Sequence, residues 1–214
     1  MDHGSSIARS ASGRLLSAGI RVRVLSIVVV VLVGVLAIVR EPGARNFGVI
    51  EEGTLYRSGR MGVAALRRVI EERHIRTIVD LGAYEPGSAE ESLESSVAEG
   101  LGVRRVVLRL RGDGTGDPNM YVDALRVMTD RNAQPVLIHC AAGTNRTGAC
   151  AMLYRHIIEG IGFGDAYREA MTYGHDPGSD WVTLTYLAEW SDEIEESLES
   201  GDTIPFRVAA RSGR

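Results

Sequence analysis

The segment from residue 139 to residue 148, which reads HCAAGTNRTG, constrains this chain more than any other part of its sequence. It places Cys140 and Arg146 six positions apart, directly after the apolar run 135–138 and directly before a helix-forming stretch. This pattern predicts a strand, a tight loop and the first turn of a helix. The backbone N–H groups of such a loop point inward, toward the positive end of the helix, so the loop can hold a tetrahedral anion.

The residue types in this loop are suited to nucleophilic chemistry on phosphate. The field that attracts an anion also stabilises a thiolate, so we expect the pKa of Cys140 to lie well below that of a free thiol. Arg146 is always charged, and its planar fork can bind two phosphoryl oxygens and the charge that develops on them. Gly143 offers a position without a Cβ, and Thr147 places a hydroxyl within reach of the Cys140 sulfur. An inert buried cysteine is the plain structural alternative.

The spacing His-Cys-x5-Arg-Thr-Gly resembles the signature of the protein tyrosine phosphatase superfamily. The similarity covers about residues 46 to 190, where 53–59 (GTLYRSG) resembles the entry segment of the dual-specificity-like branch and 75–81 (IRTIVDL) its next core strand. The small bacterial and fungal members are the most similar. The resemblance implies an α/β fold in which helices flank a mostly parallel central sheet of about four to five strands. A rhodanese-like or arsenate-reductase-like loop is a weaker alternative.

The resemblance also implies roles for individual residues. Cys140 is the expected nucleophile, with Arg146 and Thr147 beside it, while His139 orients the loop through a hydrogen bond of its ring. The expected phosphate-binding residues are those of the loop itself: Ala141, Ala142, Gly143, Thr144, Asn145 and Arg146. Neither a metal ion nor another cofactor is implied. His175 and Asp176, in a turn rich in Gly and Pro, are further candidates for lining the pocket.

The departing oxygen needs a proton that neither Cys140 nor Arg146 can give. The resemblance implies an aspartate on a loop some tens of residues before the cysteine, and the segment 111–118 offers Asp113 and Asp117. We select Asp113, because Asp117 precedes Pro118 and a helical pattern and so occupies the position of an N-cap. A plain turn residue is the alternative for Asp113. The glycines around it are typical of a mobile lid.

The expected activity is hydrolysis of phosphate monoesters on proteins through a phosphocysteine intermediate. The uncharged side chains at 141, 142, 144 and 145 favour a single phosphate, on phosphotyrosine first and on phosphoserine or phosphothreonine as further candidates. The alternatives are an inositol phosphate or phosphoinositide phosphatase, and a membrane-anchored phosphate-binding module without turnover. The expected partner is a phosphorylated protein or a small phosphate ester.

Charge and cysteine content narrow the possible partners. Residues 46–214 contain 18 Arg against 26 Asp or Glu, so this part of the chain is acidic and we expect no binding to nucleic acid. Cys140 and Cys150 are the only cysteines. The position of Cys150 in an apolar helical pattern predicts a core residue rather than a disulfide partner.

A second apolar segment lies near the N-terminus. Residues 24–39 carry no charge and are flanked by arginines, and as a helix they would extend about 24 Å, somewhat less than a hydrocarbon core of about 30 Å. We expect a single transmembrane helix whose flanking arginines reach the interfaces. The basic segment 1–23 predicts a cytoplasmic N-terminus and an extracytoplasmic catalytic domain. A cleaved signal peptide and a buried core helix are the alternatives.

These observations predict four regions: a basic segment at 1–23, a transmembrane helix or signal anchor at 24–39, a phosphatase domain at 46–198 and a disordered tail at 199–214. Within the domain, periodicity predicts a hairpin at 47–57, helices at 63–72, 89–99 and 121–130, and strands at 77–81, 103–110 and 136–139. Two or three helices follow the loop. Trp181, Tyr186 and Trp190 lie at helical spacing and are expected in the core.

Overall fold

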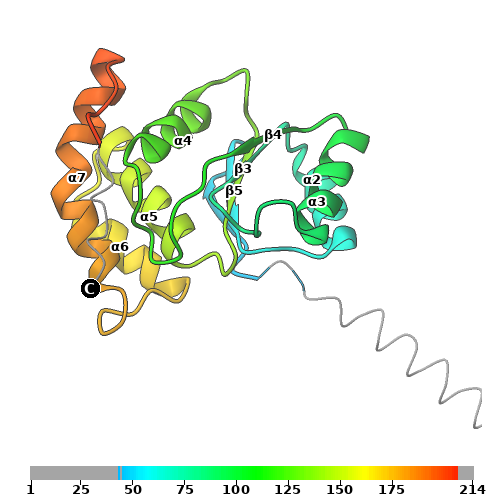
Figure 1. Cartoon of the computed structure of the whole chain (residues 1–214), viewed down its shortest axis with the longest axis horizontal. Helices are drawn as coiled ribbons and strands as arrows, with labels where there is room; N and C mark the ends of the chain where they lie inside the picture. Colours follow the sequence, from blue (N-terminus) through cyan, green and yellow to red (C-terminus); the bar gives the residue numbers. More distant parts are fainter. Residues whose placement is uncertain (1–42, 44, 207–214) are drawn as a thin grey trace, which may run out of the picture. The chain divides into compact units, whose positions relative to one another are not determined.

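The computed structural model describes residues 43 and 45–206, which form a sheet covered by helices on both faces (Figure 1). The sheet has five strands in the order β1-β2-β5-β3-β4. Their bounds are β1 Gly48–Glu51, β2 Leu55–Ser58, β3 Thr77–Asp80, β4 Arg104–Val107 and β5 Val136–His139. The β1–β2 hairpin is antiparallel and every other pair is parallel. The expected α/β fold with a mostly parallel sheet is therefore confirmed.

The helices divide into two layers. Their bounds are α2 Val63–Arg73, α3 Ala89–Gly100, α4 Asn119–Thr129, α5 Asn145–Leu153, α6 Phe163–Thr172 and α7 Trp181–Ser200, with a π-helical turn, η1, at Tyr154–Ile158. Helices α2 and α3 cover one face of the sheet, while α4, α5, α6 and α7 lie on the other (Figure 1). Each layer has its own apolar core.

Strand β5 shows how the sheet places the loop that follows it. All four of its residues are buried, because β2 and β3 flank it and helices cover both faces. Val136 and Ile138 pack into the core under α4 and α5, whereas Leu137 packs into the core under α2 and α3. The loop that follows therefore lies at the carboxyl end of the central strand, where ligands bind in open α/β sheets.

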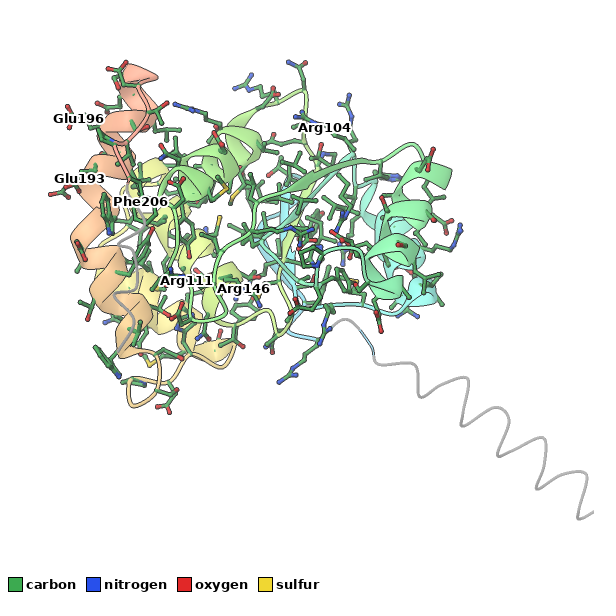
Figure 2. All side chains as sticks on the ribbon, in the orientation of Figure 1. Arg104, Arg111, Arg146, Glu193, Glu196 and Phe206 are labelled. Carbon is green, nitrogen blue, oxygen red and sulfur yellow. The ribbon has the colours of Figure 1, made fainter. Side chains whose placement is uncertain are left out.

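The C-terminal part is ordered further than the sequence suggested. Gly201 ends α7 in the left-handed conformation, with φ +81°, and the chain turns back. Ile204 is buried and exchanges two hydrogen bonds with the side chain of Asn119, at 2.9 and 3.0 Å. The ring of Phe206 contacts Trp190 at a centroid distance of 5.8 Å (Figure 2). Residues 199–206 therefore differ from the expected disordered tail; residues 207–214 lie outside the described part.

The three aromatic residues of α7 have different environments. Tyr186 is buried between Tyr121 and Trp190, as expected. Trp181, in contrast, is 62% exposed, so its assignment to the core was wrong. Trp181 is the first residue of α7, directly after the loop 173–180, and does not belong to the apolar core.

The expected membrane localisation requires a correction. Within residues 43 and 45–206, no helix combines the length and the apolar character that crossing a bilayer requires. The segment 24–39 itself lies outside the described residues, as does the basic segment 1–23. As a helix, residues 24–39 would extend about 24 Å, which is less than the thickness of a hydrocarbon core, about 30 Å. We therefore withdraw both the single-pass membrane assignment and the extracytoplasmic placement that depended on it.

Candidate active site

The loop between β5 and α5 curls around the sulfur of Cys140. This side chain is 2% exposed, and the backbone N–H of Gly143 donates to its Sγ at 3.3 Å. Gly143 has φ +77°, and a Cβ there would lie 2.5 Å from the backbone nitrogen of Gly59. The loop thus needs glycine at this position for both its conformation and its contact with the end of β2.

The surroundings of Cys140 favour its thiolate. Burial alone would raise the pKa of this thiol, but the hydroxyl and backbone N–H of Thr147, the charge of Arg146 and the N–H of Gly143 together lower it below its usual value. Thr147 is fully buried and its hydroxyl also lies 3.4 Å from the carbonyl oxygen of Ser58. Cys140 therefore has the environment of a reactive cysteine rather than of a packing residue.

Arg146 enters the same region from the first turn of α5 (Figure 2). Its Nη1 contacts the carbonyl oxygens of Leu81, at 3.3 Å, and of Gly82. Its Nε is buried and has no hydrogen-bond partner among the described residues. A buried N–H without a partner calls for an explanation, and an anion held by the loop would supply one.

A cavity of about 410 Å³ opens beside this arginine. Its lining includes Arg146 and Ala141 of the loop together with Arg60, Arg109 and Gly112. The guanidinium of Arg109 is paired with Glu91 at 2.5 Å, while the guanidinium of Arg60 lies 5.8 Å from the ring centre of Tyr84. Glu85 also lines the cavity, so three arginines face one carboxylate there, and this excess of positive charge suits an anionic ligand.

The loop is held from outside by residues that the motif does not contain. Arg57 is fully buried in β2 and donates to the carbonyl oxygen of Gly143 at 2.7 Å, with its guanidinium 3.9 Å from the ring centre of Tyr173. The amide of Asn46 donates to the carbonyl oxygen of Ala142 at 2.9 Å. Both residues lie in segments that carried the resemblance, but only the three-dimensional contact identifies their role.

Thr144 and Asn145 also use their side chains to fix the loop. The hydroxyl of Thr144 donates to the carbonyl oxygen of Tyr173 at 3.3 Å, and the amide of Asn145 donates to Asp180 at 3.2 Å. The ring of His175 lies behind the loop, with Nε2 at 3.2 Å from the carbonyl oxygen of Thr144 and Nδ1 at 3.4 Å from Asp180. His175 therefore braces the loop instead of lining the cavity.

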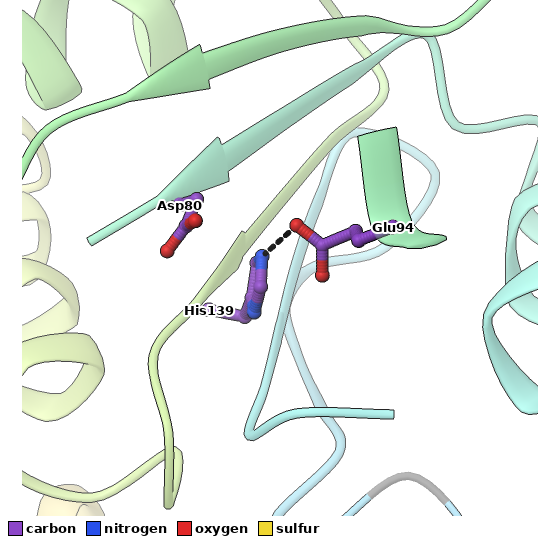
Figure 3. Close-up of side chains that lie close together, drawn as sticks. All are labelled: Asp80, Glu94 and His139. Carbon is purple, nitrogen blue, oxygen red and sulfur yellow. Dashed lines mark ion pairs between the residues drawn. The ribbon is translucent and has the colours of Figure 1, made fainter. Parts of the chain in front are cut away.

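His139 belongs to a buried charged cluster on the other side of the loop (Figure 3). Its Nε2 lies 3.2 Å from the carboxylate of Glu94, at ion-pair distance but without the alignment of a hydrogen bond. Burial lowers the pKa of His139, yet the charge of Glu94 outweighs burial and the pKa is raised. The expected role of His139 in orienting the loop stays a prediction; its partner Glu94 comes from α3 and is not marked by any sequence motif.

Asp80, Glu94 and His139 offer three ligand atoms within 4.8 Å of one another, a spacing that could hold a metal ion. The guanidinium of Arg105 already contacts both carboxylates, through Nη2 to Asp80 and through Nε to Glu94 at 2.8 Å. The guanidinium offsets one of the two negative charges, and the raised pKa of His139 favours a second positive charge beside them, so the carboxylates have cationic partners without a metal ion. We interpret the cluster as an ion-pair network under the loop.

The two candidate acids lie on the segment 111–118. The carboxylate of Asp113 is exposed and accepts from the backbone N–H and the hydroxyl of Thr115, at 3.0 and 2.8 Å. That of Asp117 accepts from the backbone N–H of Asn119 at 3.0 Å, at the start of α4. Asp117 thus has the capping contact that its sequence position suggested. Asp113 directly follows Gly112, which lines the cavity.

Comparison with known proteins shows that this chain is similar to phosphatases of the dual-specificity type. A family model described as "Polymorphic toxin system, DSP-PTPase phosphatase" matches residues 57–158. The dual specificity protein phosphatase TpbA of Pseudomonas aeruginosa is 27% identical over 109 residues, which are 50% of this chain and 50% of that protein. This chain therefore aligns with about half the length of that curated relative.

Solved structures show the same fold. The crystal structure of P. aeruginosa TpbA covers 75% of this chain and 99% of its own, with a TM-score of 0.59 and 22% identity. The core catalytic domain of the PP-IP phosphatase SIW14 from S. cerevisiae, in complex with citrate, covers 78% and 98%, with a TM-score of 0.59 and 19% identity. The family model and the curated relative relate the chain to phosphatases of the dual-specificity type, and the solved structures share its fold. The family model and the curated relative show that the chain is similar to the dual-specificity-like side of the protein tyrosine phosphatase superfamily.

Proposed function

We propose that this protein is a metal-independent phosphatase that hydrolyses phosphate monoesters on proteins through a phosphocysteine intermediate. The observation that carries the proposal is the geometry around Cys140, whose buried Sγ accepts from the N–H of Gly143 in the loop that also carries Arg146. This environment lowers the pKa of the thiol. A thiolate surrounded by backbone N–H groups and Arg146 is arranged to attack a phosphorus atom that the same loop binds.

The proposed reaction has two displacements. In the first, the Cys140 sulfur forms a bond to phosphorus while the bond to the ester oxygen breaks, and the carboxyl of Asp113 gives that oxygen a proton. In the second, water attacks phosphorus and passes a proton to Asp113 as the S–P bond breaks, which releases phosphate and restores the thiolate. Arg146 holds the phosphoryl oxygens in both steps. For Asp113 to act, its carboxyl group must release its hydrogen bonds with Thr115 and contact the ester oxygen of the substrate.

Phosphotyrosine is the first substrate that we propose, with phosphoserine and phosphothreonine next. The side chains of Thr144 and Asn145 are used to hold the loop, so they add no charge that would bind further phosphates. One observation favours a second candidate, a small inositol phosphate: Arg60 and Arg109 share a cavity with Arg146. The pairing of Arg109 with Glu91 reduces the charge that is free for such a ligand.

The test is phosphate release by the purified full chain from a phosphotyrosine peptide, a phosphothreonine peptide and soluble inositol phosphates, each with a chelator present. Cys140→Ser is assayed beside it, and Cys150→Ser is the matched control, because Cys150 is buried in the core. We expect release from the phosphotyrosine peptide that Cys140→Ser abolishes and Cys150→Ser retains. Release that survives Cys140→Ser, or that the chelator stops, would contradict the proposed mechanism.

A further inference from the structure

An apolar groove lies between α2 and α3, on the face of the sheet opposite α5. It has a volume of about 330 Å³, and its apolar lining comes from Met61, Val63, Leu66 and Leu93. Helices α2 and α3 pack against each other beside it (Figure 1). Leu66 also belongs to the apolar core under α2 and α3, and Met61 packs against that core, so the groove lies on the outer side of this core.

Two large apolar side chains face solvent at this groove. Leu93 is 54% exposed and Val63 is 40% exposed. Removal of apolar surface from water is favourable, so two exposed apolar side chains beside the same hollow favour association with an apolar group. The remaining exposed large apolar residues of the described part, Ile158, Met171 and Trp181, lie on other elements.

The groove adjoins the proposed phosphate site. Arg60 and Tyr84 line both the groove and the cavity beside Arg146. The hydroxyl of Tyr84 donates to Glu94 at 2.9 Å, which fixes the ring at the junction of the two hollows. The two hollows are therefore neighbours, and a ligand with a phosphate on the loop can reach the apolar groove by extending past these two residues.

We propose that this groove binds an apolar side chain of a phosphorylated polypeptide, a few residues away from the phosphorylated residue. This rests on the proposed function and makes it more specific. A peptide chain supplies a phosphate and an apolar side chain on one flexible backbone, with about 3.3–3.6 Å per extended residue to span the distance. An inositol phosphate has only one of the two groups, so the adjacency of the hollows favours a protein substrate.

The experiment uses the full chain and a phosphotyrosine peptide of alanines in which a single leucine is moved through the positions on either side. A small aryl phosphate, which is too short to reach the groove, is measured in parallel. We expect one or two leucine positions to raise kcat/KM at least tenfold, the discrimination that one apolar contact provides. Leu93→Glu should remove this gain and leave hydrolysis of the aryl phosphate unchanged.

The matched control is Ile158→Glu, which introduces the same charge at an exposed apolar residue of η1 and should retain the leucine gain. Equal kcat/KM for all peptides, or a gain that survives Leu93→Glu, would overturn the groove proposal. So would a rise in activity on every substrate in Leu93→Glu, because that would indicate that the chain itself occupies the groove. An equal loss on peptide and aryl phosphate would show that Leu93 supports the fold instead.

Peptide binding separates this proposal from the proposed function. The dissociation constants of the leucine and alanine peptides are measured by calorimetry with Cys140→Ser and with Cys140→Ser/Leu93→Glu, in which turnover has no part. In one outcome, the wild-type chain releases no phosphate, but Cys140→Ser binds the leucine peptide at least tenfold more tightly than the alanine peptide and Cys140→Ser/Leu93→Glu does not. The groove proposal then stands and the proposed catalysis fails. If the wild-type chain releases phosphate and Cys140→Ser binds both peptides equally, the proposed catalysis stands and the groove proposal fails.

Discussion

Glu94 is the residue whose importance is least visible in the sequence. It lies in the middle of α3, on a segment that reads as an ordinary acidic helix, yet its carboxylate is buried among His139, Arg105 and Tyr84. Burial raises the pKa of Glu94, but these partners outweigh it and lower the pKa to about 2. Glu94 therefore links α3 to His139, which directly precedes the proposed nucleophile, Cys140.

We predict that Glu94→Gln lowers the free energy of unfolding by about 3–5 kcal/mol, because it removes the carboxylate that pairs with the buried ring of His139 and leaves Arg105 with Asp80 and Glu91 alone. The loss should depend on pH. The raised pKa of His139 contributes stability that is complete below its ordinary value of about 6.5 and is lost as the pH rises through the folded value. The lowered pKa of Glu94 contributes above about 4.3 and is lost as the pH falls toward about 2.

Urea unfolding of wild type and Glu94→Gln at about pH 6 and about pH 9 measures this difference. The cost of the substitution should be larger at about pH 6, where His139 and Glu94 are both charged. Glu90→Gln is the control, since Glu90 is an exposed residue of the same helix and should change stability by less than about 0.5 kcal/mol. A cost that does not vary with pH would mean that His139 is neutral in the fold.

The segment 111–118 shows how one element positions another. Three side chains from α4 and α7 donate to its backbone: Thr183 to Asp113, Tyr121 to Gly114 and Tyr186 to Gly116. These contacts fix the outer side of the segment, and Gly112 faces the cavity. The sequence indicated a mobile lid from the glycines alone; the anchoring hydrogen bonds come from residues up to 70 positions away and could not be predicted from the local pattern.

We predict that Asp113→Asn lowers kcat on a phosphotyrosine peptide by about 10²–10⁴, because the departing oxygen loses its proton donor. The loss should be smaller on an aryl phosphate whose leaving group is more acidic. Asp117→Asn should retain kcat, since its carboxylate accepts from the backbone N–H and the side-chain amide of Asn119 at the start of α4, where an amide oxygen can replace it. Steady-state kinetics of both variants would refute the assignment if Asp117→Asn were the inactive one.

Helix α5 and the loop 173–180 meet at a glycine. A Cβ on Gly148 would lie 2.3 Å from Nε2 of His175, which is itself held by Thr144 and Asp180. We predict that Gly148→Ala costs about 1–3 kcal/mol of stability through overpacking. The double variant Gly148→Ala/His175→Ala should lose much less stability than the sum of the losses of the two single variants, which urea unfolding measures. Additive costs would mean that the two residues do not compete for the same space.

The order of elements was predictable from the sequence, while the contacts that close the fold were not. Hydrophobic periodicity predicted β5 and the start of α2 at their observed bounds, because these segments are buried on the expected faces. The strand predicted at 103–110 is β4, Arg104–Val107, since only these residues pair with β3 at the sheet edge. In the loop, Cys140 and Arg146 were found from their spacing; Arg57 and Glu94 become visible only once β2 and α3 are in place.

The C-terminal residues after α7 contribute to the stability of the described part. We predict that Ile204→Ala lowers the free energy of unfolding by about 2–4 kcal/mol, because Ile204 is buried against the core. Thr203→Ala is a neighbouring control at an exposed position. Urea unfolding of both variants gives the comparison, and equal stability of the two would show that this segment does not pack in solution.

The two thiols of this protein differ in a way that a chemist can use. The pKa of Cys140 is lowered, whereas burial raises the pKa of Cys150 to about 12. Alkylating reagents react with thiolates, so at neutral pH a haloacetamide should modify one site and leave the other intact. The average mass added per chain would then give the fraction of molecules in which the loop holds Cys140 as a thiolate. Vanadate or phosphate bound in the loop should slow the labelling in proportion to the fraction of loops that it occupies.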